Sequence, residues 1–236
     1  MKVRPIKTRI FKEGESLPLF VYEHIKSLQE GSIIVVTSKI IALSEKRTAV
    51  AENPGTKDTL IHSESDFAVR TKYVWLTLKD GMLMASAGID ESNANGKLIL
   101  LPKDSFKTAS ELRKALKRKY KIKKLGVLVT DSRTMPLRAG VIGVALGYAG
   151  FKGARDYRGK PDIFKRKFIF SRTNVADSLA TTAVLVMGEG NEQQPLAIIQ
   201  QAPVEFCEKT NRKELIIDPA DDVHKPLLRT LKKRRG

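Results

Sequence analysis

The segment from Gly140 to Gly150 places the strongest constraint on how this chain can fold. It reads Gly-Val-Ile-Gly-Val-Ala-Leu-Gly-Tyr-Ala-Gly, so four glycines recur in an otherwise apolar run. Glycine destabilises a helix by roughly 1 kcal/mol relative to alanine, and the run is far shorter than the roughly 20 residues that span a bilayer. The pattern therefore predicts a strand against which other backbone segments pack closely.

Apolar runs on both sides of this segment predict the other elements. We expect strands at 31–38, 73–78, 82–86, 125–130 and 196–201, and helices at 16–30, 110–120 and 174–187, with Gly188 as a C-cap. The strands and helices alternate without a regular βαβ rhythm, which favours a mixed α/β (α+β) fold. A chain of 236 residues predicts one unit over 1–236, or two small lobes, with a basic tail at 221–236.

The charge balance is strongly basic, with 43 Lys and Arg against 26 Asp and Glu, a net charge of +17. Such a field attracts polyanions such as nucleic acid or nucleotides, although surplus lysine can also be solvated surface. The single cysteine, Cys207, excludes a disulfide framework and cysteine-based metal clusters. The first ten residues lack the apolar core of a signal peptide, so we expect a soluble, cytoplasmic protein with no membrane contact.

Two glycine-containing segments fail the tests for known phosphate-binding loops. The segment Gly153–Lys160 has one residue too many between its glycines for a Walker A loop, and Pro161 stands where Ser or Thr should bind magnesium. Gly188-Glu-Gly190 lacks the third glycine and the preceding strand of a dinucleotide fingerprint. Neither segment predicts a nucleotide site by itself.

Acidic residues follow three apolar segments, in Gly88-Ile-Asp90-Glu-Ser-Asn93, Val129-Thr-Asp131-Ser132 and Met187-Gly-Glu189-Gly190. Carboxylates at the ends of elements can form a site for a hard cation such as Mg²⁺, which prefers oxygen ligands. The alternative is that these residues only stabilise turns, as Asp and Asn commonly do. From the pattern alone, the turn interpretation is favoured.

Several longer motifs resemble the deazaflavin-coenzyme (F-420) gamma-glutamyl ligase family. They occur in family order over about residues 30 to 200 and comprise Val36–Ile40, Ala87–Asn93, Leu100–Pro102, Val129–Ser132, Arg138–Gly147, Asp156–Asp162, Val175–Asp177 and Met187–Gly190. The resemblance implies an intertwined homodimer with the family fold. It also implies a single catalytic unit that joins L-glutamate to an acceptor carboxylate, using a nucleoside triphosphate and a divalent metal.

The resemblance also assigns roles to individual residues. The implied ligands of Mg²⁺ or Mn²⁺, of which two ions are expected, are Asp90, Asp131, Ser132 and Glu189. The implied contacts of ATP or GTP are Ser38, Lys39, Asn93 and the run Met187, Gly188, Glu189, Gly190 and Asn191. Besides Asp131, we expect Arg138 and Arg155 to act in catalysis, because arginine can grip a carboxylate or phosphate through two parallel hydrogen bonds. For each arginine, a solvated surface position is an equal alternative.

The chain departs from the family pattern beside the expected reaction centre. Leu43 stands where the family commonly has lysine, which leaves ATP or GTP open, and the loop 132–137 differs from the family loop after the metal-binding aspartate. The segment 113–124 holds eight Lys or Arg in twelve residues, which is either a solvated helix face or a track for a polyanion.

These departures and the charge lead us to expect an acceptor other than the deazaflavin coenzyme. The C-terminus of a protein, such as a ribosomal protein, is the preferred acceptor, with folate or the deazaflavin coenzyme as alternatives. Several glutamates would be added, with α- or γ-linkage open. A basic RNA- or ribosome-binding protein without catalysis is the alternative of another class, although aromatic residues for base stacking make up only 6% of the chain.

Overall fold

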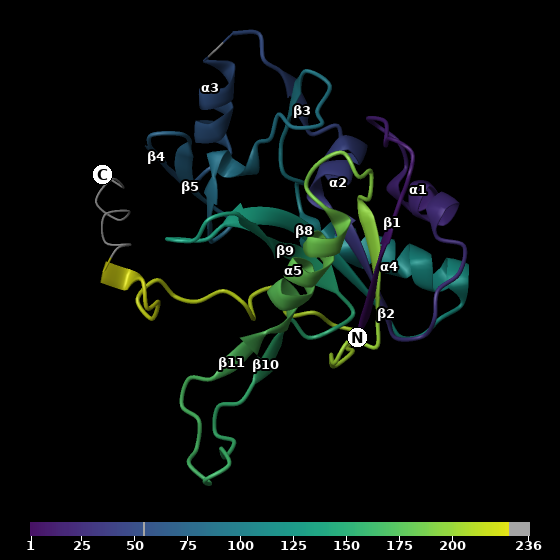
Figure 1. Ribbon diagram of the computed structural model, residues 1–236, viewed down its shortest axis with the longest axis vertical. Helices are drawn as coiled ribbons and strands as arrows, with labels where there is room; N and C mark the ends of the chain where they lie inside the picture. Colours follow the sequence, from purple (N-terminus) through teal and green to yellow (C-terminus); the bar gives the residue numbers. More distant parts are fainter. Residues whose placement is uncertain (54, 227–236) are drawn as a thin grey trace.

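A five-stranded mixed sheet forms the centre of the molecule, as a computed structural model describes it for residues 1–53 and 55–226. Its strand order is β1 (Lys2–Ile6), β12 (Leu196–Gln200), β2 (Ser32–Thr37), β8 (Leu125–Thr134) and β9 (Val141–Ala149) (Figure 1). Only β2 and β8 are parallel neighbours, and the other pairs are antiparallel. The mixed α/β prediction is confirmed, whereas the final ten residues of the expected basic tail 221–236 lie outside the described residues.

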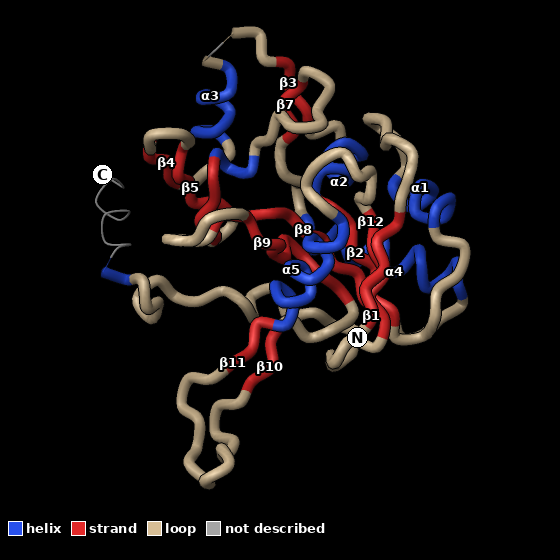
Figure 2. The backbone as a smooth tube through the Cα atoms, in the orientation of Figure 1, coloured by secondary structure: helices blue, strands red, loops and turns tan. Residues whose placement is uncertain are grey.

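Helices cover both faces of this sheet because its central strands are apolar on both sides. Ile34 and Val36 of β2 face a cluster with α1 (Leu17–His24), α2 (Ser38–Ser44) and α4 (Ser105–Tyr120). Ile33 and Val35 face the opposite cluster, which contains α5 (Val175–Met187). Burial on both faces explains why β2 is a continuous apolar run. Figure 2 shows α5 crossing in front of the sheet.

The glycine-rich segment forms β9, and its glycines lie against both helix layers. A Cβ on Gly143 would lie 2.4 Å from the carbonyl oxygen of Ala180 in α5, and one on Gly147 would lie 2.5 Å from the carbonyl carbon of Ser105 in α4. Glycines four residues apart normally share one face of a strand. Here the register shifts at Leu146, so that the two glycines face opposite helices. The predicted close backbone packing is confirmed.

Smaller elements form a second group beside the central sheet. The three-stranded sheet β4–β5–β6 (Phe67–Arg70, Trp75–Lys79, Met82–Ala85) and the pair β3–β7 (Thr48–Val50, Lys97–Ile99) accompany α3 (Thr56–Ser63). Their shared core contains Ile61, Ile89, Leu98 and Leu100, separate from the two main clusters. The strands expected at 73–78 and 82–86 lie in this group, but β3, β4, β7 and α3 were not predicted.

A long hairpin projects from the body of the molecule. Its strands β10 (Ala154–Asp156) and β11 (Arg172–Asn174) pair at the base, and residues 157–171 form the outer loop (Figure 1). The outer loop exposes four large apolar side chains, Ile163, Phe164, Ile169 and Phe170, which are 65–89% accessible. The sequence analysis did not predict this hairpin, because neither strand carries an apolar run.

Three predicted boundaries are wrong, each for a physical reason. The first helix ends at His24 rather than residue 30, because the chain becomes extended where Ile25 enters the core. The helix expected at 110–120 is α4, and it begins five residues earlier, at Ser105. Asp104 caps it by accepting a hydrogen bond from the backbone N–H of Lys107. The strand expected at 125–130 is β8, and it runs through Thr134 because β9 pairs with it that far.

None of the helices in the described residues has both the length and the apolar character that a membrane span requires.

Candidate functional site

The parallel pairing of β2 and β8 brings together the first two predicted site residues. Thr37 pairs with Thr130, so the residues that follow them, Ser38 and Asp131, leave the pair side by side. The Ser38 hydroxyl donates a 3.1 Å hydrogen bond to Oδ1 of Asp131. Asp131 was expected just past a strand end, but it lies within β8 opposite Val144.

Asp90 enters the same region from the second group of elements. Nζ of Lys39 donates to Oδ2 of Asp90 at 2.8 Å and to the carbonyl of Ser92 at 2.8 Å. The Ser92 backbone N–H and hydroxyl donate to the two oxygens of Asp90. The preceding Ser86, Ala87 and Gly88 all have positive φ, a costly conformation for the first two, which fixes how the chain enters this turn.

Asn93 links this turn to the segment after α5. Its side-chain amide donates a 3.1 Å hydrogen bond to the carbonyl of Gly190. Segments near residues 38, 90, 131 and 190, distant in sequence, therefore converge through three side-chain hydrogen bonds. The acidic motifs alone favoured turns, whereas the family resemblance implied that residues of these segments share one site.

The two carboxylates have opposite electrostatic environments. Burial raises the pKa of Asp131, and the nearby charge of Asp90 adds to the effect, although Arg133 and the Ser38 hydroxyl oppose it. Burial also disfavours the charged form of Asp90, but the hydrogen bonds from Lys39 and Ser92 outweigh it and lower the pKa of Asp90. Asp131 is therefore the carboxylate whose negative charge is least compensated.

The oxygen donors suit a divalent cation in chemical type. Asp131 is a carboxylate whose desolvation a cation would offset, and a second carboxylate, Asp90, is close enough to influence its pKa. Glu189 is exposed, and Ser132 makes no side-chain hydrogen bond to another described residue. Across 1–53 and 55–226, no three His, Cys, Asp or Glu side chains are gathered into a metal-binding group. The implied set of four ligands is thus brought together only in part.

The expected nucleotide segment 187–191 begins inside the core. The Met187 side chain is 2% exposed within the α5 cluster, so only its backbone could reach a ligand. Gly188 ends the helix with φ 82°, as predicted for a C-cap glycine. Gly190 donates its N–H to Glu192, and Asn191 is exposed. The exposed backbone after Gly188 is the part available for contact.

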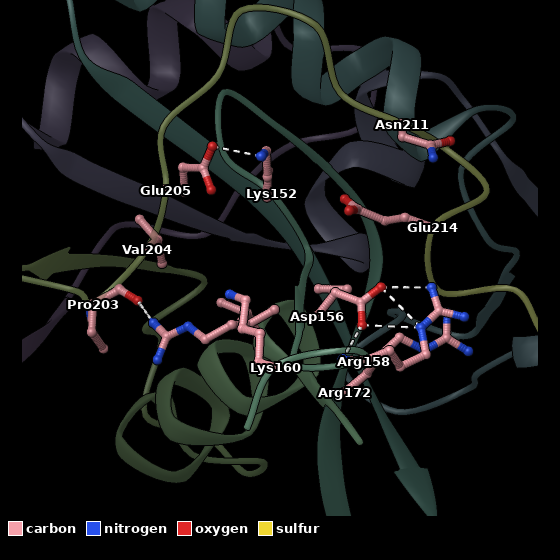
Figure 3. Close-up of a pocket in the computed structure, with 13 residues that line it drawn as sticks. Lys152, Asp156, Arg158, Lys160, Arg172, Pro203, Val204, Glu205, Asn211 and Glu214 are labelled. Atoms are coloured by element: carbon pink, nitrogen blue, oxygen red, sulfur yellow. Dashed lines mark hydrogen bonds and ion pairs between the residues drawn. The ribbon is translucent and has the colours of Figure 1, made fainter. Parts of the chain in front are cut away.

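The two arginines expected in catalysis lie apart from this cluster. Arg138 is exposed in the loop between β8 and β9, and its backbone N–H donates to Met135. Arg155 stands at the base of the projecting hairpin, where its guanidinium donates to the carbonyl of Pro203, which Figure 3 labels. It lines a cavity of about 450 Å³ whose lining includes neither Asp90 nor Asp131. Hydrogen bonds within the described residues do not join either arginine to the cluster.

The basic segment 113–124 lies mostly on the end of α4 and is amphipathic. Arg113 is buried and donates to the carbonyl of Leu125 and to both oxygens of Glu208, and Lys117 also pairs with Glu208. The other six cations are exposed: Lys114, Arg118, Lys119, Lys121, Lys123 and Lys124. The segment therefore combines structural pairing with a solvated basic face.

Two residues of the site were missed by the sequence analysis. Ser92 could have been found, because Asp followed two residues later by Ser is the spacing of an Asx turn. Arg133 could not, because nothing near it in sequence shows that its side chain is 92% buried and donates to the carbonyl of Leu83. Its Nε and Nη2 have no hydrogen-bond partner among residues 1–53 and 55–226, and burial lowers the pKa of this arginine.

Comparisons with known proteins find similar chains among glutamate ligases. The family model of F420-0:gamma-glutamyl ligase matches residues 5–201. Curated relatives include coenzyme F420:L-glutamate ligase of Methanococcus maripaludis, 35% identical over 83% of this chain and 86% of the relative. The proteins of the same name from Methanosarcina acetivorans and Methanocaldococcus jannaschii are 32% and 30% identical. They match 97% and 94% of this chain and 96% of each relative.

Proposed function

The chain belongs to the F420-0:gamma-glutamyl ligase family, and on that premise we propose that it is a glutamate ligase acting on coenzyme F420. The observation that carries the proposal is the convergence of four segments, which contain Ser38, Asp90 with Asn93, Asp131, and Gly190, at positions that match the family motifs. The reaction joins the amino group of L-glutamate to a carboxylate of the acceptor.

The acceptor is the deazaflavin coenzyme rather than a protein C-terminus. The relatives that cover most of this chain carry the coenzyme in their names. The preference for a protein acceptor depended on net charge, which describes attraction to anions in general. Folate stays a further candidate, because the loop 132–137 beside Asp131 differs from the family pattern.

Activation of the acceptor by ATP or GTP explains the residue types at the site. The acceptor carboxylate attacks the γ-phosphorus, the bond to the β-phosphate oxygen breaks, and the diphosphate leaves. The glutamate amine then attacks the acyl carbon, inorganic phosphate leaves, and the amine loses a proton. Because two anions must meet, positioning and charge neutralisation should supply most of the rate.

Asp90, Asp131, Ser132 and Glu189 would hold Mg²⁺ or Mn²⁺ at the site. A divalent ion supplies charge screening between the triphosphate and the acceptor carboxylate. Ser38 donates to one oxygen of Asp131 and thereby orients this carboxylate. Lys39 pairs with Asp90, and a second cation would compete with its ammonium group for that carboxylate.

The functional unit is a homodimer. The hairpin loop 157–171 exposes Phe164 and Phe170 at 83% and 86%, away from the core of its own chain. Large apolar side chains clustered on a projecting arm are the type of surface that a partner covers. A second copy of this chain is the partner that we propose, with the arm of each subunit on the other.

Ligation reactions followed by mass spectrometry test the proposed function. Each reaction contains the purified full chain, Mg²⁺, L-glutamate, ATP or GTP, and one acceptor: the deazaflavin coenzyme, folate, or a peptide that ends in glutamate. We expect glutamyl additions on the deazaflavin coenzyme, and none when the nucleotide is omitted. Additions on the peptide alone would overturn the choice of acceptor, and no addition on any acceptor would overturn the ligase.

A further inference from the structure

A cavity of the described residues lies at the base of the projecting hairpin. It has a volume of about 450 Å³ and lies between β10, β11, the first residue of α5 and the segment 203–214 (Figure 3). This volume is within the range of about 300–1,000 Å³ that is typical of small-molecule sites. The role of the central cluster does not account for this cavity, because its lining includes no residue of that cluster.

Cations outnumber anions in the lining. Five cationic side chains, Lys152, Arg155, Arg158, Lys160 and Arg172, surround the cavity against three carboxylates, Asp156, Glu205 and Glu214. Low-dielectric walls focus the field of such a charge excess into a cavity and attract anions. The lining therefore favours a ligand with more than one negative charge.

The three carboxylates already have partners in the protein. Glu205 pairs with Lys152 at 2.5 Å, and Asp156 pairs with Arg158 at 2.5 Å. Glu214 accepts hydrogen bonds from the Tyr148 hydroxyl and the Gly153 N–H, which holds the cavity wall in place. Two of these acids pair with cations, whereas Glu214 is bound by neutral donors and keeps its charge, so the lining has an excess of two positive charges.

Arg155, Lys160 and Arg172 form no ion pair with any residue in 1–53 and 55–226. Arg155 donates only to the carbonyl of Pro203 and the Tyr157 hydroxyl, and Lys160 lies over the Tyr157 ring. Figure 3 shows Lys160 and Arg172 among the side chains around the cavity. Two guanidinium groups and one ammonium group can each bind a carboxylate of a ligand.

The first turn of α5 connects this cavity with the strand that bears Asp131. Val175 lines the cavity, and two residues later Asp177 accepts the backbone N–H of Ala145 at 2.8 Å. The neighbouring Val144 pairs with Asp131 across β8 and β9. The start of α5 therefore joins the wall of the cavity to the strand pair that carries Asp131.

We propose that this cavity binds the carboxylates of a γ-linked glutamyl chain, the part of the acceptor that precedes the reacting carboxylate. The inference depends on the proposed function, because that reaction is the source of such a chain. Each added glutamate contributes one more carboxylate, so the three unpaired cations favour acceptors that already carry glutamate. The cavity would thus select the length of chain that is extended.

Direct binding to the full chain tests the inference without catalysis. The probe is γ-linked triglutamate, measured by isothermal titration calorimetry at low salt with no nucleotide or metal. The double variant Arg155→Gln/Arg172→Gln should bind about tenfold more weakly than the natural chain, because two charge-assisted contacts are lost. The matched control Lys114→Gln/Arg118→Gln removes the same charge from the exposed face of α4 and should bind as the natural chain does.

Several results would overturn the inference. One is no binding of triglutamate to the natural chain, and another is equal weakening by both double variants, which would mean attraction by net charge. A parallel titration with inorganic phosphate distinguishes the source of the anion. Tighter binding of phosphate than of triglutamate, lost in the Arg155/Arg172 variant, would assign the cavity to a phosphate-bearing ligand instead.

Activity measurements separate this inference from the proposed function. With an acceptor that already carries glutamate, the Arg155→Gln/Arg172→Gln variant should raise KM by about tenfold and leave kcat within about twofold. An unchanged KM in an active ligase would overturn the cavity assignment and leave the function standing. Loss of triglutamate binding in the variant, with no ligation of any acceptor by the natural chain, would overturn the function and leave the cavity as a polycarboxylate site.

Discussion

The hydroxyl of Ser38 donates a 3.1 Å hydrogen bond to Oδ1 of Asp131, across 93 positions of the chain. The bond joins the first residue of α2 to the middle of β8, and it forms because β2 and β8 are parallel neighbours in the sheet. It orients a carboxylate whose desolvation the protein compensates only in part. Such a group is typical of a functional site rather than of a turn.

Replacing Asp131 by Asn should abolish glutamate ligation while the fold persists. The amide keeps the size of the side chain and can still accept from Ser38, but it cannot carry the negative charge that the site requires. We expect a loss of at least about 100-fold in kcat, measured by mass spectrometry of product. The control Asp80→Asn makes the same change in an exposed turn and should retain activity. Full activity of Asp131→Asn would contradict the assignment.

Replacing Gly147 by Ala should destabilise the fold by about 2–4 kcal/mol. The new Cβ would lie 2.5–2.8 Å from backbone atoms of Ser105 and Phe106, which cannot move without shifting the start of α4. Chemical denaturation followed by circular dichroism measures the free energy of unfolding. The control Gly55→Ala meets only a side-chain oxygen at 3.3 Å and should change stability by less than about 1 kcal/mol. Equal stability of both variants would contradict the close packing of β9.

Replacing Glu208 by Gln should lower stability by about 1 kcal/mol near neutral pH, because the buried Arg113 loses its paired carboxylate. The effect is no larger because Glu208 is exposed and solvent screens the ion pair. Hydrogen bonds from Arg113 and Lys117 lower the pKa of Glu208 from 4.5 to about 2. Because the folded-state pKa is depressed, the stabilisation is present above pH 4.5 and is lost as the pH falls toward 2.

Thermal unfolding over a pH series measures this difference between the natural chain and Glu208→Gln. The gap in Tm should narrow as the solution becomes more acidic than pH 4.5, because Glu208 then binds a proton in the unfolded chain before it does so in the folded protein. Glu111→Gln removes an exposed carboxylate of α4, the helix that carries Arg113, and Glu111 has no ion pair among the described residues, so this variant should show no such gap. A gap for Glu208→Gln that stays constant with pH would point to packing instead of charge.

Replacing both Phe164 and Phe170 by Ser should convert the proposed homodimer into a monomer. Both rings are exposed within one chain, so the substitutions remove contacts between chains without opening a core. Light scattering coupled to size-exclusion chromatography gives the mass in solution. Leu19→Ser, at a 65% exposed position on α1, is the control and should leave the mass unchanged. A natural chain that elutes as a monomer would refute the dimer.

The sequence by itself determined the elements that have strong local signals. Apolar runs predicted β2 and β8, Gly188 predicted the end of α5, and the glycines at 143 and 147 predicted close packing of β9, because each signal depends on neighbours within a few residues. The family resemblance, rather than the acidic motifs alone, implied which segments would carry the site. The hairpin β10–β11 has no such signal and was missed.

Tertiary structure alone decided which of these residues meet. The parallel pairing of β2 with β8 brought Ser38 to Asp131, and the register shift at Leu146 turned Gly143 and Gly147 toward opposite helices. Folding also buried Arg133 beside Asp131 and placed Arg155 at a separate cavity. Contacts between positions far apart depend on strand register and on how whole layers pack, and a pattern of neighbouring residues does not specify either one.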